Sequence, residues 1–309
     1  MRAHPTALVN PNAGSFSPAR LRSLREAGVR ALLTPTLDAL DEALRDLNAT
    51  TDPALWAVGG DGTFVTVLSR LHARSAAPPP LGLIPWGSGN AVSSWLRAEG
   101  APSVTHRSMI EVHGKLTPFV GIGLHGAMSH HVDAARRHWP TRNLAVSALW
   151  KLIPVFVSLP HASTRPAPRV RVVTRTPAHP VSARGEVGAQ LPAGTCLWHG
   201  PALLVDASTC PSLGYGHRLF PHAERLQGHA QLRVLDMSAL SWLRTFPDAR
   251  RGRLRHPGAH SWLVKDVDID VDAPSPLSIA GDADGMVQEV HMRVRQRVPL
   301  VAGYPSSTS

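Results

Sequence analysis

The feature that most constrains this chain is a unit of strand, glycine turn and helix that occurs three times in its first third. Each unit begins with a short apolar run, continues with a turn that contains glycine, and ends in a segment of helical character. This alternation predicts a parallel sheet with helices on its faces. The apolar runs are Thr6–Asn10, Leu55–Val58 and Leu81–Pro85, and the turns are Asn10-Pro11-Asn12-Ala13-Gly14, Gly59-Gly60-Asp61-Gly62-Thr63 and Gly87-Ser88-Gly89-Asn90.

Helix signals lie between and after these strands. Ser17 followed by Pro18 indicates the N-cap and first turn of a helix that runs to about Gly28. Leucines then recur at helical spacing from Leu37 to Leu47. We also expect a second strand at Val29–Leu33 and helices at Thr63–Leu71 and Asn90–Leu96.

The remainder of the chain has a different pattern, which is typical of antiparallel β structure. Ser108–Val112 and Leu116–Gly121 flank His113-Gly114-Lys115 and predict a hairpin, and Leu144–Val157 is a strongly apolar helix. We therefore expect an α/β N-terminal domain with a parallel sheet, residues 1–115, and a mostly antiparallel β domain, residues 116–309. The last strand of the second domain could return to the first. Further short strands are predicted at Val170–Arg175, Cys196–Val205, Gln231–Asp236 and Val267–Val271.

The three glycine turns suit the binding of phosphate groups. Glycine lets the backbone come close to a ligand, and the free N–H groups at the start of the following helix point at an anion. Because all three turns are expected at the carboxyl edge of one parallel sheet, they predict a nucleotide crevice at that edge. The chain has no GxxxxGK[ST] and no GxGxxG after its first strand, so neither a P-loop nor a dinucleotide fingerprint is present.

Asp61 is the charged residue among these turns. It stands directly before a helix, where an aspartate can serve merely as a cap. At a phosphate site the same carboxylate could instead bind Mg²⁺ or accept a proton from an attacking hydroxyl group. Because positioning and charge neutralisation dominate phosphoryl transfer, Asp61 is our candidate for both the metal ligand and the catalytic residue.

The charge of the chain favours an anionic partner. The formal net charge is +10, almost all of it from arginine, although an arginine-rich genome would produce the same bias. Sparse aromatic residues and the lack of a basic helix argue against nucleic acid. No apolar run approaches the roughly 20 residues of a membrane span, and the N-terminus lacks the apolar stretch of a signal peptide. We therefore expect a cytoplasmic protein with peripheral membrane contact.

Together the three turns resemble those of the diacylglycerol kinase catalytic domain family, which includes bacterial lipid kinases, sphingosine kinases and ceramide kinase. The resemblance rests on Asn-Pro-x-x-Gly after the first strand, Gly-Gly-Asp-Gly-Thr after the third and Gly-Ser-Gly-Asn after the fourth. The form Gly87–Ala91 is closer to the sphingosine kinases. Later features that match are Arg136-Arg137 and Arg142 before an apolar helix, Gly214-Tyr215-Gly216 with Phe220-Pro221-His222-Ala223, Arg255-His256-Pro257, and Asp284-Gly285.

The resemblance implies a two-domain architecture shared by lipid kinases and NAD kinases. It also implies ATP and Mg²⁺ as cofactors, with a lipid substrate that enters a cleft between the domains. Asp61 would serve the metal or act as a base, and Arg142 would offset phosphate charge with its planar guanidinium group. The residues implied for nucleotide binding are Asn10, Asn12, Thr34, Gly59, Gly60, Asp61, Gly62, Thr63, Gly87, Ser88, Gly89, Asn90 and Arg142.

Three departures from the family pattern bear on catalysis and substrate. The family motif Asp-Gly-Glu supplies a base through its glutamate, whereas this chain has Asp284-Gly285-Met286. The role then passes to Asp61, or to Asp284 as a nearby substitute, or activity is impaired. The carboxylates that hold a structural Mg²⁺ in bacterial members are missing from residues 227–231, which predicts that this site is absent. No acidic residue precedes Asp133 in the segment that would bind a sphingoid amine, which favours neutral lipids.

The sequence therefore predicts an ATP-dependent lipid kinase that transfers the γ-phosphate to a lipid hydroxyl group of diacylglycerol, ceramide or a sphingoid-type lipid. Two alternatives stay open. A soluble NAD kinase-like enzyme would share Gly-Gly-Asp-Gly-Thr but not the other two turns. An ATP-binding protein with reduced or no catalysis is suggested by Met286, because a methionine cannot accept a proton.

Overall fold

The structure, a computed structural model, describes residues 5–47, 54–87, 89–97, 101–138, 167–213 and 217–304. The chain divides into two compact units. The N-terminal unit comprises residues 1–107 and 296–309, and the β-rich unit comprises residues 108–295. The sequence-based boundary between residues 115 and 116 falls inside the β-rich unit, at strand β6 (Lys115–Thr117).

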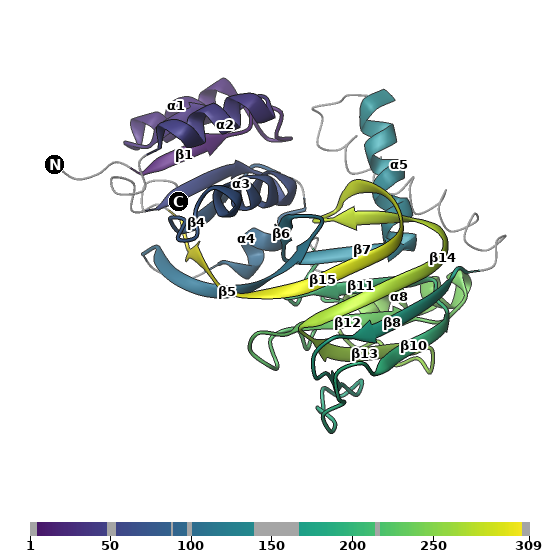
Figure 1. Ribbon diagram of the computed structural model, residues 1–309. Helices are drawn as coiled ribbons and strands as arrows, with labels where there is room; N and C mark the ends of the chain where they lie inside the picture. Colours follow the sequence, from purple (N-terminus) through teal and green to yellow (C-terminus); the bar gives the residue numbers. More distant parts are fainter. Residues whose placement is uncertain are drawn as a thin grey trace. The chain divides into compact units, whose positions relative to one another are not determined.

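The N-terminal unit alternates strands and helices, as the sequence predicts (Figure 1). Its parallel strands lie in the order β2-β1-β3-β4, and the end of β15 (Asp282–Ala302) pairs with β4 through Leu300 and Leu81. Helix α3 begins two residues before the predicted Thr63, because Gly60 is its N-cap. The other elements are β1 (Thr6–Val9), α1 (Pro18–Glu26), β2 (Arg30–Leu33), α2 (Leu37–Asp46), β3 (Leu55–Gly59), α3 (Asp61–Arg74), β4 (Leu81–Pro85) and α4 (Ala91–Trp95).

Local sequence signals account for these elements. Ser17 caps α1 by accepting a hydrogen bond from the N–H of Arg20, and Thr36 caps α2 in the same way. Every residue of β1 and β3 is buried, on both faces of the sheet. Burial on both faces is what a parallel sheet covered by helices on each side requires.

The β-rich unit is built from antiparallel strands in the order β15-β14-β7-β11-β12-β13-β9, while β8 pairs with β14 and β10. The predicted combination of a parallel α/β part and an antiparallel β part is therefore confirmed. The remaining elements are β5 (Ser103–Val112), β7 (Phe119–Gly123), α5 (Leu124–His138), β8 (Arg169–Thr174), β9 (His179–Pro180), β10 (Cys196–Pro201), β11 (Leu204–Ser208), β12 (Ala230–Leu235), α8 (Ala239–Arg250), β13 (Ala259–Val264) and β14 (Asp266–Ile279).

Two predicted strands are wrong in extent. The hairpin between β5 and β6 exists, but β6 ends at Thr117 and residues from Phe119 form β7, which pairs with β11 and β14. Pro118 separates them, and a proline has no N–H to continue a ladder. Likewise the predicted strand of residues 196–205 is two strands. Pro201 ends β10, which pairs with β8, and β11 pairs with β7 and β12.

The core of the β-rich unit lies between its sheet and helix α8. Leu204 and Leu235 from the sheet pack with Trp242 of α8 and with Leu254 after it. Among the described residues, no helix is both long and apolar enough to cross a membrane. The predicted apolar helix of residues 144–157 lies outside the described residues.

Candidate functional site

The turns that follow the parallel strands meet at the carboxyl ends of those strands. The side-chain amide of Asn10, after β1, donates a hydrogen bond of 3.0 Å to the hydroxyl oxygen of Thr63 in α3. The N–H of Ser15 donates to the carbonyl of Trp86 after β4, at 2.9 Å. The N–H of Gly87 donates to the carbonyl of Gly59, at 3.0 Å. The three predicted glycine turns thus form one connected edge.

Two of these turns touch backbone to backbone. A Cβ atom added at Gly87 would lie 2.4 Å from the Cα of Gly60 and 3.1 Å from its nitrogen. A Cβ at Gly60 would in turn lie 3.3 Å from the Cα of Gly87. Backbone atoms cannot yield as a flexible side chain can, so the contact requires glycine at position 87. Close backbone approach of this kind is the physical reason for glycine in a phosphate-binding turn.

Asp61 joins the same two turns through its carboxylate. One oxygen, Oδ2, accepts a hydrogen bond from the N–H of Ala91 at 2.9 Å, and Oδ1 accepts one from the N–H of Val92 at 3.0 Å. Asp61 is 9% exposed. The carboxylate therefore caps helix α4, thirty residues further along the chain, and not the helix that contains it.

The first turn of α3 remains open to an anion. Its N-cap residue is Gly60, so no cap side chain occupies the N–H groups at the start of this 14-residue helix. Asn90 adds a polar atom, because its side-chain oxygen is buried and has no hydrogen-bond partner among the described residues. Asn90 has a left-handed backbone, with φ of 53°, which glycine and asparagine adopt most readily. A site with open donors and an unpaired buried acceptor fits a nucleotide with a hydrated Mg²⁺.

Other predicted nucleotide residues are engaged with the backbone. The side-chain amide of Asn12 donates to the carbonyl of Pro35 at 3.2 Å, and the hydroxyl of Thr34 donates to the carbonyl of Val9 at 3.2 Å. Gly62 lies in the first turn of α3, and Gly89 lies in the turn after β4. Ser88 and Arg142 lie outside the described residues.

Asp284, the second predicted catalytic residue, belongs to the β-rich unit. Its carboxylate forms ion pairs with Lys115 and with His113, the latter at 3.1 Å, so it is tied to the turn between β5 and β6. Met286, which stands in the place of the family glutamate, is 57% exposed. Within the β-rich unit, Asp284 therefore has a clear structural role besides its predicted catalytic one.

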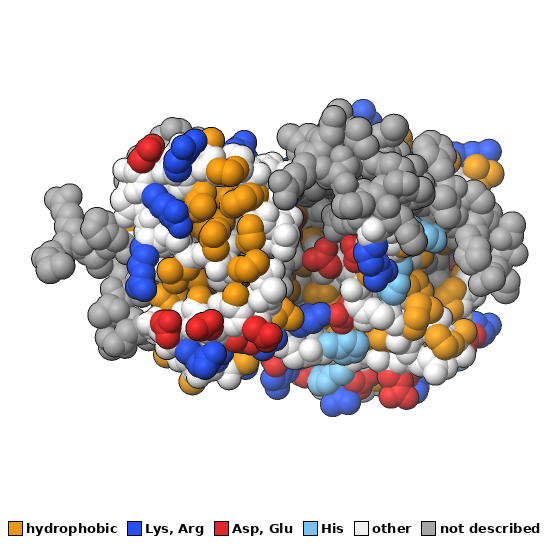
Figure 2. Space-filling model, turned by 90° about the horizontal axis from the view of Figure 1, so that it is seen from above, with side chains coloured by type: hydrophobic (Ala, Val, Ile, Leu, Met, Phe, Trp, Pro, Cys, Tyr) orange, Lys and Arg blue, Asp and Glu red, His pale blue; other side chains and the backbone are white. Residues whose placement is uncertain are grey.

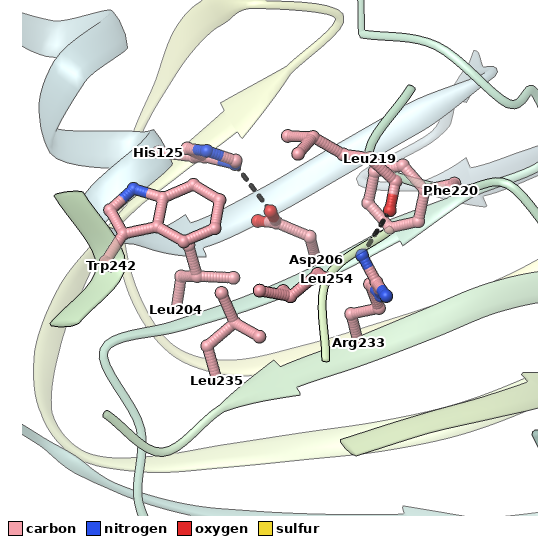
Figure 3. A pocket seen from close by; sticks show the side chains of 9 residues that line it. All are labelled: His125, Leu204, Asp206, Leu219, Phe220, Arg233, Leu235, Trp242 and Leu254. Atoms are coloured by element: carbon pink, nitrogen blue, oxygen red, sulfur yellow. Dashed lines mark hydrogen bonds and ion pairs between the residues drawn. The ribbon is translucent and has the colours of Figure 1, made fainter. Parts of the chain in front are cut away.

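A second polar group lies inside the core of the β-rich unit (Figure 3). Asp206 of β11 stands opposite Arg233 of β12 in the antiparallel register, and His125 of α5 pairs with Asp206 at 2.5 Å. Gly121 makes room for them, because a Cβ there would lie 2.5 Å from Oδ1 of Asp206. Sequence reasoning missed this cluster. The available signal was a charged residue inside each of two otherwise apolar strands.

The cluster borders a small apolar cavity. Leu219 and five other aliphatic or aromatic residues line the rest of the cavity. Its volume is about 10 Å³, which is roughly the space of one water molecule. An acyl chain could not enter without movement of these side chains. The remaining lining residues are Leu204, Phe220, Leu235, Trp242 and Leu254.

Burial and charge act in opposite directions on this cluster. Burial, the largest influence, lowers the pKa of His125, but the charge of Asp206 and the hydrogen bond with it together raise that pKa above its usual value. Burial also lowers the pKa of Arg233 to about 10, partly offset by the charge of Asp206. The guanidinium of Arg233 donates to the carbonyl of Leu219 at 2.6 Å.

The fold of the chain and the sequence of its N-terminal part can each be compared with known proteins. A parallel α/β part combined with an antiparallel β part is a fold that this chain shares with solved structures described as diacylglycerol kinases. Residues 4–118 match the family model of the diacylglycerol kinase catalytic domain, so this part of the chain carries that domain and the predicted resemblance is confirmed.

Solved structures share the fold along the whole chain. A crystal structure of a diacylglycerol kinase from Bacillus anthracis str. Sterne is 16% identical, with a TM-score of 0.63 over 99% of this chain and 98% of that one. Two structures of a candidate diacylglycerol kinase from the same strain are 17% and 18% identical, each with a TM-score of 0.65. They cover 98% and 99% of this chain, and the same shares of their own. No protein of curated function has a matching sequence.

Proposed function

We propose that the protein is an ATP-dependent lipid kinase that transfers the γ-phosphate of ATP to a lipid hydroxyl group. The observation that carries this proposal is the interlocked set of turns at the carboxyl ends of β1, β3 and β4. There Gly60 and Gly87 meet at the backbone, and the start of α3 is free of a side-chain cap. The match of residues 4–118 to the diacylglycerol kinase catalytic domain supports the same function from the sequence.

Each residue of the edge has a role in this proposal. The phosphates of ATP bind at the first turn of α3, where N–H groups and the helix dipole favour negative charge. Asp61 is the residue that would hold Mg²⁺, because it places a buried carboxylate at this edge and carboxylate oxygens are ligands of that ion. Asn90 can bind water on the metal through its unpaired oxygen. The metal supplies charge neutralisation at the transferred phosphate when it is bound.

Besides its role in metal binding, the carboxylate of Asp61 holds the turns of the site in position. Because Asp61 connects the start of α3 to the start of α4, it keeps the turns after β3 and β4 at a constant separation. Positioning is the main contribution of a protein to phosphoryl transfer, whose loose transition state needs little covalent assistance. A base that accepts the hydroxyl proton then adds a further factor of roughly 10²–10⁴.

A second candidate function follows from the state of the residues at which a general base is expected. Asp61 is hydrogen-bonded to two amides, Asp284 is paired with Lys115 and His113, and Met286 cannot accept a proton. This arrangement favours an ATP-binding protein whose transfer is slow or absent. It predicts that ATP binds and that no phosphorylated lipid forms.

The acceptor we propose is a neutral lipid such as diacylglycerol or ceramide, reached by peripheral contact with a membrane. A nucleic-acid partner is not part of the proposal. Figure 2 shows basic and acidic side chains interspersed on the described surface turned to the viewer, so the net charge of +10 is not gathered there into a basic stripe.

One assay separates these functions. Purified protein is incubated with ATP, Mg²⁺ and one of five acceptors: diacylglycerol, ceramide, sphingosine, monoacylglycerol or NAD, with the lipids dispersed in detergent. Products are identified by mass. A phosphorylated lipid supports the proposal and phosphorylated NAD overturns it. ATP binding measured by calorimetry, together with no product from any acceptor, favours the binding protein.

A further inference from the structure

Helix α8 of the β-rich unit is apolar on two opposite sides. Its inner side carries Trp242 and Ala249, which are buried in the core between the helix and the sheet. Its outer side carries Leu240 and Leu243, with Pro247 one further turn along. Residues three and four apart share one face of a helix, so these three form a single stripe.

The two leucines of the outer stripe are about half exposed to solvent. Leu240 is 54% exposed and Leu243 is 50% exposed, and they are two of the seven large hydrophobic residues with such exposure in the described chain. A surface helix normally places charged or polar residues opposite its buried side. Neighbouring exposed leucines at that position indicate a surface that contacts an apolar environment.

Exposed arginines lie on α8 and in the segment that follows it. Arg244 lies on the outer side of α8, and the exposed side chains that follow the helix are strongly basic, with Asp248 as the one acidic residue from 239 to 255. None of these arginine side chains forms an ion pair with a residue in the described part of the chain. The arginines are Arg244, Arg250, Arg251, Arg253 and Arg255.

We propose that the outer face of α8 is the membrane anchor of this protein. Leu240 and Leu243 enter the boundary between the headgroups and acyl chains, and the arginines bind the phosphates of anionic phospholipids. A helix of 12 residues is about 18 Å long, which suits one that lies in the plane of the interface. The inference rests on the proposed function in one respect, because a lipid acceptor places the enzyme at a membrane.

The arginine charges and the exposed leucines together favour an anionic membrane as the partner of this face. Each arginine near an anionic surface contributes about a fivefold increase in binding, equivalent to about 1 kcal/mol. A nucleic acid would also attract the arginines. However, nucleic acids gain binding affinity by stacking their bases on aromatic side chains, and the exposed stripe contains aliphatic side chains instead. Only an apolar interface uses both kinds of residue.

Vesicle flotation of the full chain tests the anchor without nucleotide or acceptor. Vesicles contain either phosphatidylcholine alone or phosphatidylcholine with phosphatidylglycerol. We expect binding to the anionic vesicles that weakens with salt, and weaker binding to the neutral ones. The double variant Leu240→Ser/Leu243→Ser lowers binding by at least about tenfold. The variant Arg244→Gln/Arg253→Gln lowers it by about 25-fold on the anionic vesicles, fivefold for each arginine.

Matched controls change exposed residues of the same type elsewhere in the β-rich unit. Val187→Ser, at a position 45% exposed, controls for the leucines, and Arg184→Gln controls for the arginines. Both controls keep wild-type binding. All the changed side chains are exposed, so thermal unfolding of each variant should match the wild type, which excludes misfolding as the cause of lost binding.

Three results would overturn the inference. Equal vesicle binding by the leucine variant and the wild type removes α8 from membrane contact. Loss of dimerisation or of RNA binding in the variants, with no vesicle binding by the wild type, assigns the face to a second copy or to nucleic acid. The protein could also phosphorylate a detergent-dispersed lipid without binding vesicles. That result would contradict the membrane anchor but not the proposed function.

Discussion

The carboxylate of Asp61 should contribute to stability as well as to chemistry. It accepts hydrogen bonds from the N–H groups of Ala91 and Val92, at 2.9 Å and 3.0 Å, in a buried position. In Asp61→Asn, one of the two acceptor oxygens becomes an NH₂ group that faces an N–H donor. A hydrogen bond to a charged group contributes about 1.5–3 kcal/mol, and a buried group left unpaired costs about 1–3 kcal/mol. We therefore expect a destabilisation of about 2–4 kcal/mol.

Urea-induced unfolding measures this loss, and hydrogen exchange locates it. The amides of α4 should exchange faster in Asp61→Asn, while those of the β-rich unit keep their wild-type rates. Glu42→Gln is a suitable control, because Glu42 is an exposed carboxylate on α2 of the same unit. Its free energy of unfolding should stay within about 0.5 kcal/mol of the wild type. Wild-type stability and exchange in Asp61→Asn would refute the bridging role. If the role holds, loss of activity in that variant is evidence about catalysis only at temperatures where the variant is folded.

Three further predictions follow from single contacts. Gly87→Ala places a methyl group 2.4 Å from the Cα of Gly60, so it should lower the free energy of unfolding by about 1–3 kcal/mol and abolish ATP binding by calorimetry. Gly14→Ala, with nothing within 4 Å, should leave the free energy of unfolding unchanged. His125 has a raised folded-state pKa, so its stabilising pair with Asp206 is fully present below about pH 6.5 and is lost as the pH rises through the raised pKa. The stability difference between wild type and His125→Gln should accordingly shrink as the pH is raised from about 6 through that raised pKa, and a pH-independent difference would contradict the pairing. Lys115→Met removes an exposed partner of Asp284 and should cost less than about 1 kcal/mol in urea unfolding, and a larger loss would show that the pair is structurally essential.

The sequence predicted what local signals determine. Strands β1, β3 and β4 and their glycine turns follow from short apolar runs with a breaker after each, and the cap at Ser17 follows from one residue and the proline beside it. The meeting of the turns at one edge follows from the rule that parallel strands share a carboxyl end. These features need no knowledge of distant contacts.

The sequence could not predict contacts between distant segments. The amides capped by Asp61 lie thirty residues away, and an aspartate before a helix more commonly caps that same helix. The pairing of β7 with β11 and β14 was not predictable either, because both partners lie far along the chain, although Pro118 was a local sign of the break before β7. The pairing of Asp206 with Arg233 likewise depended on the register of two strands, although a charge inside an apolar strand was a usable sign.

The central claim is that the edge formed by the glycine turns transfers the γ-phosphate of ATP to a lipid hydroxyl group. The most direct test is incubation of the protein with Mg²⁺, a neutral lipid and ATP whose γ-phosphoryl oxygens carry ¹⁸O, followed by mass spectrometry of the lipid. Our account predicts a phosphorylated lipid that carries the labelled phosphoryl group, with no such product from Gly87→Ala. Unlabelled lipid from the wild type, under conditions where ATP is bound, would contradict it.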